Sequence, residues 1–140
     1  MEGKIPLDVF IIDDMAIVEG RKDKSRIELI QITLKQRVST GIIGKIDSNY
    51  NNPNLTTVSG KFHLVLCNKN YFDKNEMDLV ASGFRRFPFY LYLITQQDQN
   101  KYLAKLKEYG FNLPGTITGI IEKEIWKCVD DTLKYYNQKQ

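Results

Sequence analysis

Five short apolar runs mark the chain, and longer polar or amphipathic stretches separate them. They cover residues 9–12, 41–46, 62–67, 87–95 and 114–117. The first run is rich in β-branched residues and does not alternate with polar ones, which is typical of a strand covered on both faces. The pattern therefore predicts five short strands inside the protein.

Apolar residues at helical spacing occupy much of the chain between these runs. The apolar positions at this spacing are Ile27, Ile30 and Leu34; Met77, Val80, Ala81 and Phe84; Tyr102, Leu103, Leu106 and Tyr109; and Ile121, Ile125, Val129, Leu133 and Tyr136, the last set marking a buried helix face. Between the second and third strands the helical pattern is poor, and the Asn-rich stretch 48–54 is typical of a loop. The last helix is predicted over residues 119–136.

Three features mark the ends of the predicted helices. Asp73 followed by Glu76 is typical of a capping box. Asp98 is placed to cap the next helix. Gly110 stands where the end of that helix favours a left-handed residue.

Strands that alternate with helices predict an α/β fold with a parallel sheet and helices on both faces. A length of 140 residues fits one domain over 1–140. In such sheets, ligands bind beyond the carboxyl ends of the strands. The residues at those ends are Asp13, Asp14, Asn68 and Thr95, so we expect them to converge.

Charge and composition argue against several classes of function. The net charge of +3 comes from 20 basic and 17 acidic residues spread along the chain, which argues against nucleic-acid binding by this domain alone. No apolar stretch reaches the roughly 20 residues of a membrane helix, and the start has no signal pattern, so we expect a soluble cytoplasmic protein. Cys67, Cys128 and the single His63 are too few for a zinc site, and both thiols are expected to be buried.

The strand-end motifs follow one another in an ordered set. VFIIDD (9–14) places an acidic pair after a strand, HLVLCN (63–68) ends a strand at Asn68, LIT (93–95) ends one at Thr95, and GFNLPGTIT (110–118) surrounds the last strand. In this order and spacing they resemble the receiver domain of two-component response regulators. The resemblance covers nearly the whole chain, including the helix and strand over 26–48. It implies a flavodoxin-like (CheY-like) doubly wound sheet with strand order 2-1-3-4-5.

The departures from the receiver pattern concern its chemistry. Asn68 stands where the resemblance places the phosphorylated Asp, and an amide is a poor nucleophile without charge to hold Mg²⁺. The position of the family's Lys falls near Ile117 or Thr118, so this Lys is lost here. Gln96 stands after Thr95, where the family usually has a small residue. The segment 15–25 is longer than the family's link and is interpreted as a lid or a strand extension.

Together these features predict a pseudo-receiver that is not an enzyme, needs no cofactor and regulates by contact with a protein partner or a second copy. In the family, phosphorylation remodels the face made by the fourth helix, fifth strand and fifth helix. That face corresponds to residues 98–110 and 114–136 here. Its predicted contact residues are Tyr102, Leu106, Tyr109 and Trp126.

The acidic pair leaves several interpretations open. Asp13 and Asp14 are weak candidates for Mg²⁺ binding, or Lys69 neutralises one of them. Asp13, Asp14, Asn68 and Thr95 are alternatively plain polar strand ends. His63 has no catalytic partner that the sequence identifies.

Two other functions remain as hypotheses. The chain is alternatively a small flavodoxin-like enzyme or nucleotide or metal binder that uses Asp13 and Asp14, although no Gly-rich phosphate loop follows any strand. It is alternatively the N-terminal regulatory domain of a longer DNA-binding response regulator, in which KYYNQKQ (134–140) begins a linker.

Overall fold

A single five-stranded sheet organises the chain. The computed structural model describes residues 6–13, 24–36, 38, 41–50, 62–81, 84, 88–112, 114–118 and 122–138. Its strands are β1 (Leu7–Asp13), β2 (Ile43–Tyr50), β3 (Leu64–Asn68), β4 (Phe89–Ile94) and β5 (Pro114–Thr118). All neighbours pair in parallel, in the order β2-β1-β3-β4-β5. This confirms the predicted flavodoxin-like α/β fold and its strand order.

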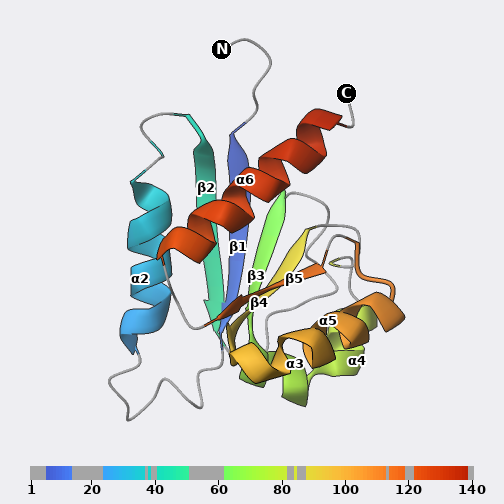
Figure 1. Cartoon of the computed structure of the whole chain (residues 1–140). Coiled ribbons are helices and arrows are strands. Elements are labelled where there is room, and N and C mark those ends of the chain that lie inside the picture. The colour runs from blue at the N-terminus through green and yellow to red at the C-terminus, as the bar shows by residue number, and fades with distance from the viewer. Residues whose placement is uncertain are drawn as a thin grey trace.

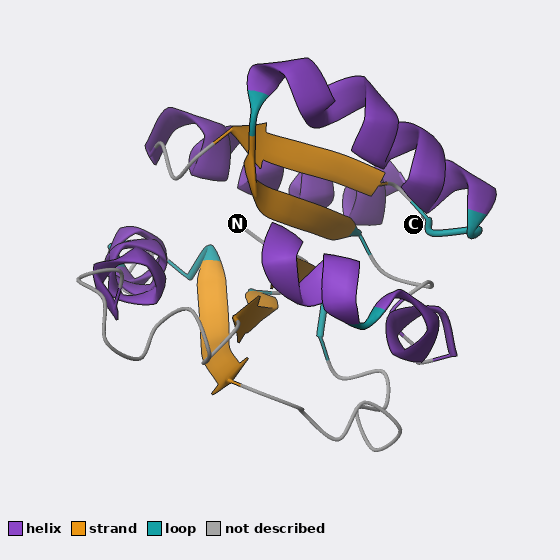
Figure 2. Cartoon of the chain, turned by 90° about the horizontal axis from the view of Figure 1, so that it is seen from below, coloured by secondary structure: helices purple, strands orange, loops and turns teal. Residues whose placement is uncertain are grey.

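Within the described residues, five α-helices flank the sheet (Figure 1). They are α2 (Lys24–Lys35), α3 (Lys69–Lys74), α4 (Glu76–Ala81), α5 (Gln99–Glu108) and α6 (Glu122–Gln138). None of the helices in the described part of the chain is long and apolar enough to span a bilayer. Figure 2 views the chain from below, the side at which the parallel strands end.

Some predicted boundaries were wrong, and others cannot be compared. Strand β2 continues to Tyr50, so residues 48–50 of the predicted loop belong to the sheet, where they pair with β1. The poor helix expected before β3 falls largely on residues 51–61, which lie outside the described residues. Asp14 and residues 15–23 of the predicted lid or strand extension also lie outside them.

Side-chain alternation along the strands builds two cores. On β1, Phe10 and Ile12 face the first core, whereas Val9 and Ile11 face the second. The first core packs against α3, α4 and α5, and the second against α2 and α6. Helices therefore cover both faces of the sheet, as the unbroken apolar runs predicted.

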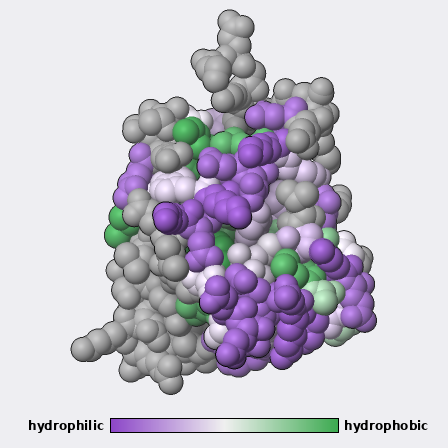
Figure 3. All heavy atoms as spheres, in the orientation of Figure 1, coloured by the Kyte–Doolittle hydropathy of each residue, from purple (hydrophilic) through white to green (hydrophobic). Residues whose placement is uncertain are grey.

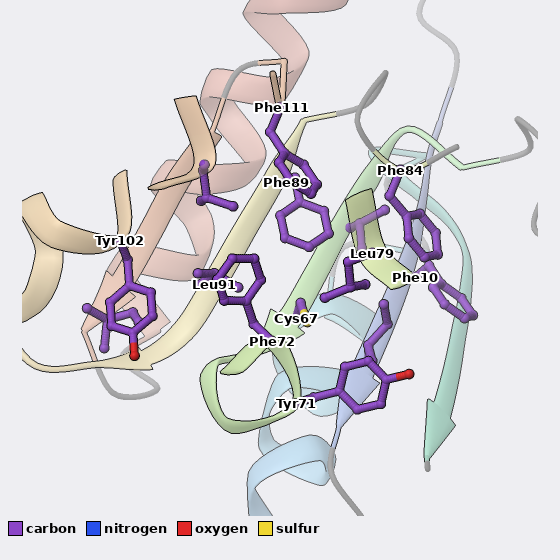
Figure 4. Close-up of a cluster of buried hydrophobic side chains, with 14 residues drawn as sticks. Phe10, Cys67, Tyr71, Phe72, Leu79, Phe84, Phe89, Leu91, Tyr102 and Phe111 are labelled. Carbon is purple, nitrogen blue, oxygen red and sulfur yellow. The ribbon is translucent and has the colours of Figure 1, made fainter. Parts of the chain in front are cut away.

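The first core is built largely from aromatic rings (Figure 4). The Phe89 and Phe111 ring centroids lie 4.6 Å apart, and Phe84 lies 5.8 Å from Phe10 and 6.4 Å from Phe89. Rings at these separations add to the burial of apolar area. They tie β1, β4 and the loop after α5 into one body.

Two predictions about the segment after β3 were wrong. Asp73 does not begin a helix, because α3 already starts at Lys69 and Asn75 is its C-cap. Helix α4 begins at Glu76, and its buried residue is Leu79, whereas Met77 is 69% exposed. The earlier start follows from a cap that the strand itself supplies, described below.

Gly110 ends α5 as predicted. Its φ is +84°, and its N–H donates to the carbonyl of Lys107 at 3.0 Å. The next N–H, of Phe111, donates to the carbonyl of Leu106 at 3.0 Å. This pair of bonds is a Schellman motif, and the buried side chains of Leu106 and Phe111 supply its hydrophobic contact.

We expect Gly110→Ala to lower the free energy of unfolding by about 1 kcal/mol, because a Cβ is strained in the left-handed region. Gly110→Asn is the matched control and should cost less, since Asn tolerates that region. Urea unfolding followed by circular dichroism measures both variants. Equal stability of Gly110→Ala and the parent would contradict the role of the motif.

Candidate functional site

The carboxyl ends of β1, β3 and β4 lie side by side because these strands are neighbours in a parallel sheet. Asp13 is the last residue of β1, Asn68 is the last residue of β3, and Thr95 follows β4. The backbone therefore brings these three predicted site residues to one edge of the sheet. Asp14 lies outside the described residues, and the Asp13 side chain is not described.

Asn68 is fully buried and serves as the N-cap of α3. Its side-chain oxygen Oδ1 accepts the backbone N–H of Asn70 at 2.7 Å and that of Tyr71 at 3.4 Å. Asn is among the preferred capping residues, because a side-chain oxygen satisfies N–H groups that lack a partner within the helix. Oδ1 of Asn68, which lies where the receiver pattern places the nucleophile, therefore accepts backbone hydrogen bonds.

Thr95 does not lie opposite Asn68 in the register of β3 and β4. In the β3–β4 register Asn68 pairs with Tyr92, so Thr95 follows three residues further, up to about 10 Å of extended chain. Thr95 is exposed and is the N-cap residue of a short 3-10 helix, Gln96–Asp98, without a side-chain capping bond. Gln96 is exposed in that helix.

A bulge at Leu93 separates Thr95 from the regular sheet. The register of β4 against β5 shifts between Tyr92 and Ile94, and Leu93 has φ of +66°. Tyr92 and Leu93 both pack on the second core, and Ile94 returns to the first. The extra residue thus reverses the alternation at the end of β4, as β-bulges do.

Tyr92 fills part of the strand-end region. It is 1% exposed, and its hydroxyl donates to the carbonyl of Ile12 at 3.1 Å. By alternation it shares a face with Asn68, its partner in the register. A large phenol therefore spans from β4 to β1 beside the end of β3.

The remaining candidates take structural roles. Lys69 forms an ion pair with Asp73, with 3.7 Å between Lys69 Nζ and Asp73 Oδ2, four residues along α3. Nδ1 of His63 accepts the backbone N–H of Asp8 at 2.9 Å, and its ring packs edge-on against Tyr136. Cys67 and Cys128 are buried free thiols, as predicted, and burial raises the pKa of Cys128 well above its ordinary value.

One prediction about the face formed by α5, β5 and α6 was wrong. Tyr102 and Leu106, predicted as contact residues, are buried at 3% and 0% exposure in the first core. Burial raises the pKa of Tyr102, and the hydrogen bond that its hydroxyl donates to Asp73 at 2.9 Å raises it further. Tyr109 and Trp126 are half-buried and keep part of their surface exposed. Helical spacing predicted which side of α5 is apolar, but it did not predict that the first core encloses that side.

Helix α5 is fastened to α4 by a small polar network. Glu76 accepts hydrogen bonds from the hydroxyl of Tyr109 and from Lys105 Nζ, the latter at 3.1 Å. The bond from Tyr109 holds the pKa of Glu76 below its ordinary value of 4.5; burial opposes this effect, and the bond and charge of Lys105 reinforce it. The same contacts raise the pKa of Tyr109 and of Lys105.

A cavity of about 370 Å³ opens between α5, β5 and α6. Its lining includes Tyr90, Gln99, Thr116, Glu124, Lys127 and Asp131. Figure 3 shows that hydrophilic side chains cover much of α5 and α6 on this side of the molecule. The ring of Tyr90 lies so close to Gly115 that a Cβ there would collide with it, so glycine lets this ring form part of the cavity wall.

Near this cavity, Thr118 and Glu124 join the end of β5 to the first turns of α6. Oε1 of Glu124 accepts the hydroxyl of Thr118 at 2.7 Å and its backbone N–H at 3.1 Å. Gln99 of α5 donates to the same hydroxyl at 3.2 Å. Thr118 is one of the two positions onto which the resemblance places the receiver Lys, and here it holds three elements together.

The chain matches no protein-family model and no curated protein. Among the described residues, no group of three His, Cys, Asp or Glu side chains could hold a metal ion.

Sequence reasoning missed Tyr92, Leu93 and Glu124. The capping role of Asn68 had a signal, an Asn between an apolar run and a polar stretch. No local signal marked the other three residues, because their roles depend on the register of β4 and on packing at the end of β5.

We expect Asn68→Ala to lower the free energy of unfolding by about 1–3 kcal/mol, because two backbone N–H groups lose their acceptor. Asn70→Ala is the matched control and should change stability little, since Asn70 contributes its backbone N–H to the cap. Chemical denaturation measures both. Similar losses for the two variants would contradict the assigned cap.

Glu76 should make stability depend on pH. Its folded-state pKa is lowered, so its contribution is complete above 4.5 and disappears as pH falls through the folded-state value. The difference in Tm between the parent and Glu76→Gln should be largest near neutral pH and should disappear once the pH lies below the folded-state pKa of Glu76. Asp78→Asn, which removes another acid from the first turn of α4, is the control. A difference in Tm that does not change with pH would refute the contribution of Glu76.

Proposed function

We propose that the chain is a receiver-like regulatory module that acts by binding a protein partner and does not use aspartyl phosphorylation. The observation that carries the proposal is the state of Asn68. It ends the central strand, is fully buried, and gives its side-chain oxygen to the N–H groups of Asn70 and Tyr71. A residue in this state is a structural cap and not a nucleophile.

The surroundings of Asn68 support the same proposal. A phosphorylation site needs a reachable carboxylate, a cation and a hydroxyl that converge on one phosphoryl group. Thr95 stands beyond the register position of Asn68 and is separated from it by the Leu93 bulge. The ammonium of Lys69 is paired with Asp73. The side chains of Asn68, Thr95 and Lys69 therefore do not surround a common position for a phosphoryl group.

The binding half of the proposal rests on the face of α5, β5 and α6. This face includes the edge strand β5, the partly exposed side chains of Tyr109 and Trp126, and a polar cavity. Trp and Tyr are enriched among residues that dominate protein interfaces. The network from Glu76 to Lys105 and Tyr109 holds α5 in place and so keeps the face preformed.

The phosphorylation half is tested with acetyl phosphate and Mg²⁺, followed by intact-protein mass spectrometry. We expect no phosphoryl adduct on the parent protein or on Asn68→Asp, because the oxygen at this position is buried and accepts two N–H groups. BeF₃⁻ with Mg²⁺ should leave the amide spectrum of both proteins unchanged.

An authentic receiver domain that is labelled under the same conditions serves as the positive control. A stable adduct on Asn68→Asp would refute the interpretation that the environment as well as the nucleophile is lost. An adduct on the parent protein at any strand-end residue would refute the phosphorylation-independent function.

A further inference from the structure

The single histidine of the chain joins β1 to the segment that leads into β3. Nδ1 of His63 accepts the backbone N–H of Asp8 at 2.9 Å, and the carbonyl of Asp8 accepts the backbone N–H of His63 at 2.8 Å. These two bonds precede the first regular pair of the ladder, Val9 with Leu64. A side-chain nitrogen thus takes the place that a backbone carbonyl has in the rest of this parallel ladder.

The same histidine holds the end of α6. The hydroxyl of Tyr136 donates to the backbone carbonyl of His63 at 3.0 Å, and the two rings meet edge-on with 5.1 Å between their centroids. Burial, reinforced by the neighbouring Tyr135, raises the pKa of Tyr136 to about 12, so its hydroxyl keeps its proton and remains a donor near neutral pH. Tyr135 itself accepts a hydrogen bond from the side chain of Asn112. The last turn of α6 is therefore held at two points, and His63 supplies one of them.

The bond from Asp8 requires a neutral imidazole. A neutral ring carries its hydrogen on one nitrogen and accepts on the other, so the hydrogen of His63 belongs on Nε2. A protonated ring donates from both nitrogens, and a hydrogen on Nδ1 would face the N–H of Asp8. Imidazole is the side chain that ordinarily changes charge between pH 5 and 8. The bond is therefore present while the ring is neutral and is lost as falling pH protonates the ring.

The surroundings of His63 allow this response. The residue is half-buried, so solvent reaches it. The titratable groups that the described residues place around it are Asp8 on β1, and Tyr136 with Tyr135 on α6. The carboxylate of Asp8 lies beside Gly44 of β2, the neighbour of β1 opposite β3. Carboxylates and phenols ordinarily titrate outside the range of pH 5 to 8, so the imidazole is the group of this set that responds within it.

We propose that His63 is a pH-dependent clamp for the end of α6. With a neutral ring, it fastens the start of β3 to β1 and packs against Tyr136. When the ring gains a proton, it turns away from the N–H of Asp8, the contact with Tyr136 is lost, and the last turn of α6 loosens. Ile125 and Val129 keep the rest of the helix on the second core, so the change is confined to its C-terminal end. The inference does not depend on the proposed function.

Hydrogen exchange of the full chain, labelled with ¹⁵N, tests the clamp. Protection factors of the backbone amides of 134–138 are compared at pH 8 and pH 5.5, after correction for the intrinsic exchange rates. We expect protection to be about tenfold lower at pH 5.5, the effect of losing one hydrogen bond, while the amides of 89–94 in β4 stay unchanged. Glu76 does not contribute at these values, because its folded-state pKa lies below 4.5.

Three variants assign the effect to the imidazole. His63→Asn replaces Nδ1 by an amide oxygen that accepts the N–H of Asp8 and does not gain a proton. Its protection should equal that of the parent at pH 8 and should not change at pH 5.5. His63→Leu has no acceptor and should show low protection at both pH values. Tyr136→Phe removes the bond to the carbonyl of His63, so its protection should be low at pH 8 and should change less with pH than that of the parent.

The tautomer of the ring gives an independent check. A long-range ¹H–¹⁵N spectrum of the imidazole at pH 8 should show a hydrogen on Nε2 and none on Nδ1. A hydrogen on Nδ1 at that pH would overturn the proposal, as would equal protection of 134–138 at the two pH values in the parent. A change with pH that persists in His63→Asn would assign the effect to another group and would also overturn it.

A loss of protection in β4 equal to that in α6 would show that acid loosens the whole protein, which contradicts a local clamp. If His63→Leu fails to fold, the tautomer of the parent and its comparison with His63→Asn still decide between the clamp and its absence.

Discussion

The side-chain amide of Asn68 joins the most central strand of the sheet to the helix that follows it. Every residue of β3 is buried, so its last polar side chain needs partners inside the protein. It finds two of them in the first N–H groups of α3. This local solution lets α3 begin directly after the strand and carry Tyr71 and Phe72 into the first core. The arrangement of the helical layer on this face follows from that early start.

The same edge of the sheet is shaped by β4. The bulge at Leu93 reverses the inward and outward positions, so that Tyr92 reaches across to the carbonyl of Ile12 while Thr95 passes into an exposed turn. A bulge inserts one residue and redirects those after it. The strand ends thus lie together in the backbone, whereas Asn68 caps α3, Tyr92 packs in the second core and Thr95 is exposed. A fold alone does not define a function.

Polar groups also gather at the border of the sheet that β5 forms. There β5 has a single neighbour, and α5 and α6 approach it from the two sides. Glu124 serves Thr118 with Oε1, its Oε2 accepts no hydrogen bond from any described residue, and Asp131 forms no ion pair with a described residue. Folding normally satisfies such groups, because their desolvation is costly.

Most of the architecture could be predicted from the sequence. Short β-branched runs such as 9–12 specify buried parallel strands, the spacing of Ile125 and Val129 specifies the inner face of α6, and Gly110 specifies the end of α5. These signals are local, because periodicity and left-handed geometry are properties of neighbouring residues. Three features could be seen in the folded protein alone: Tyr102 and Leu106 are enclosed, Glu76 binds Tyr109 from 33 positions away, and Thr95 lies beyond Asn68. Burial, strand register and the partners of polar groups depend on contacts between distant segments, and a pattern along the chain does not contain them.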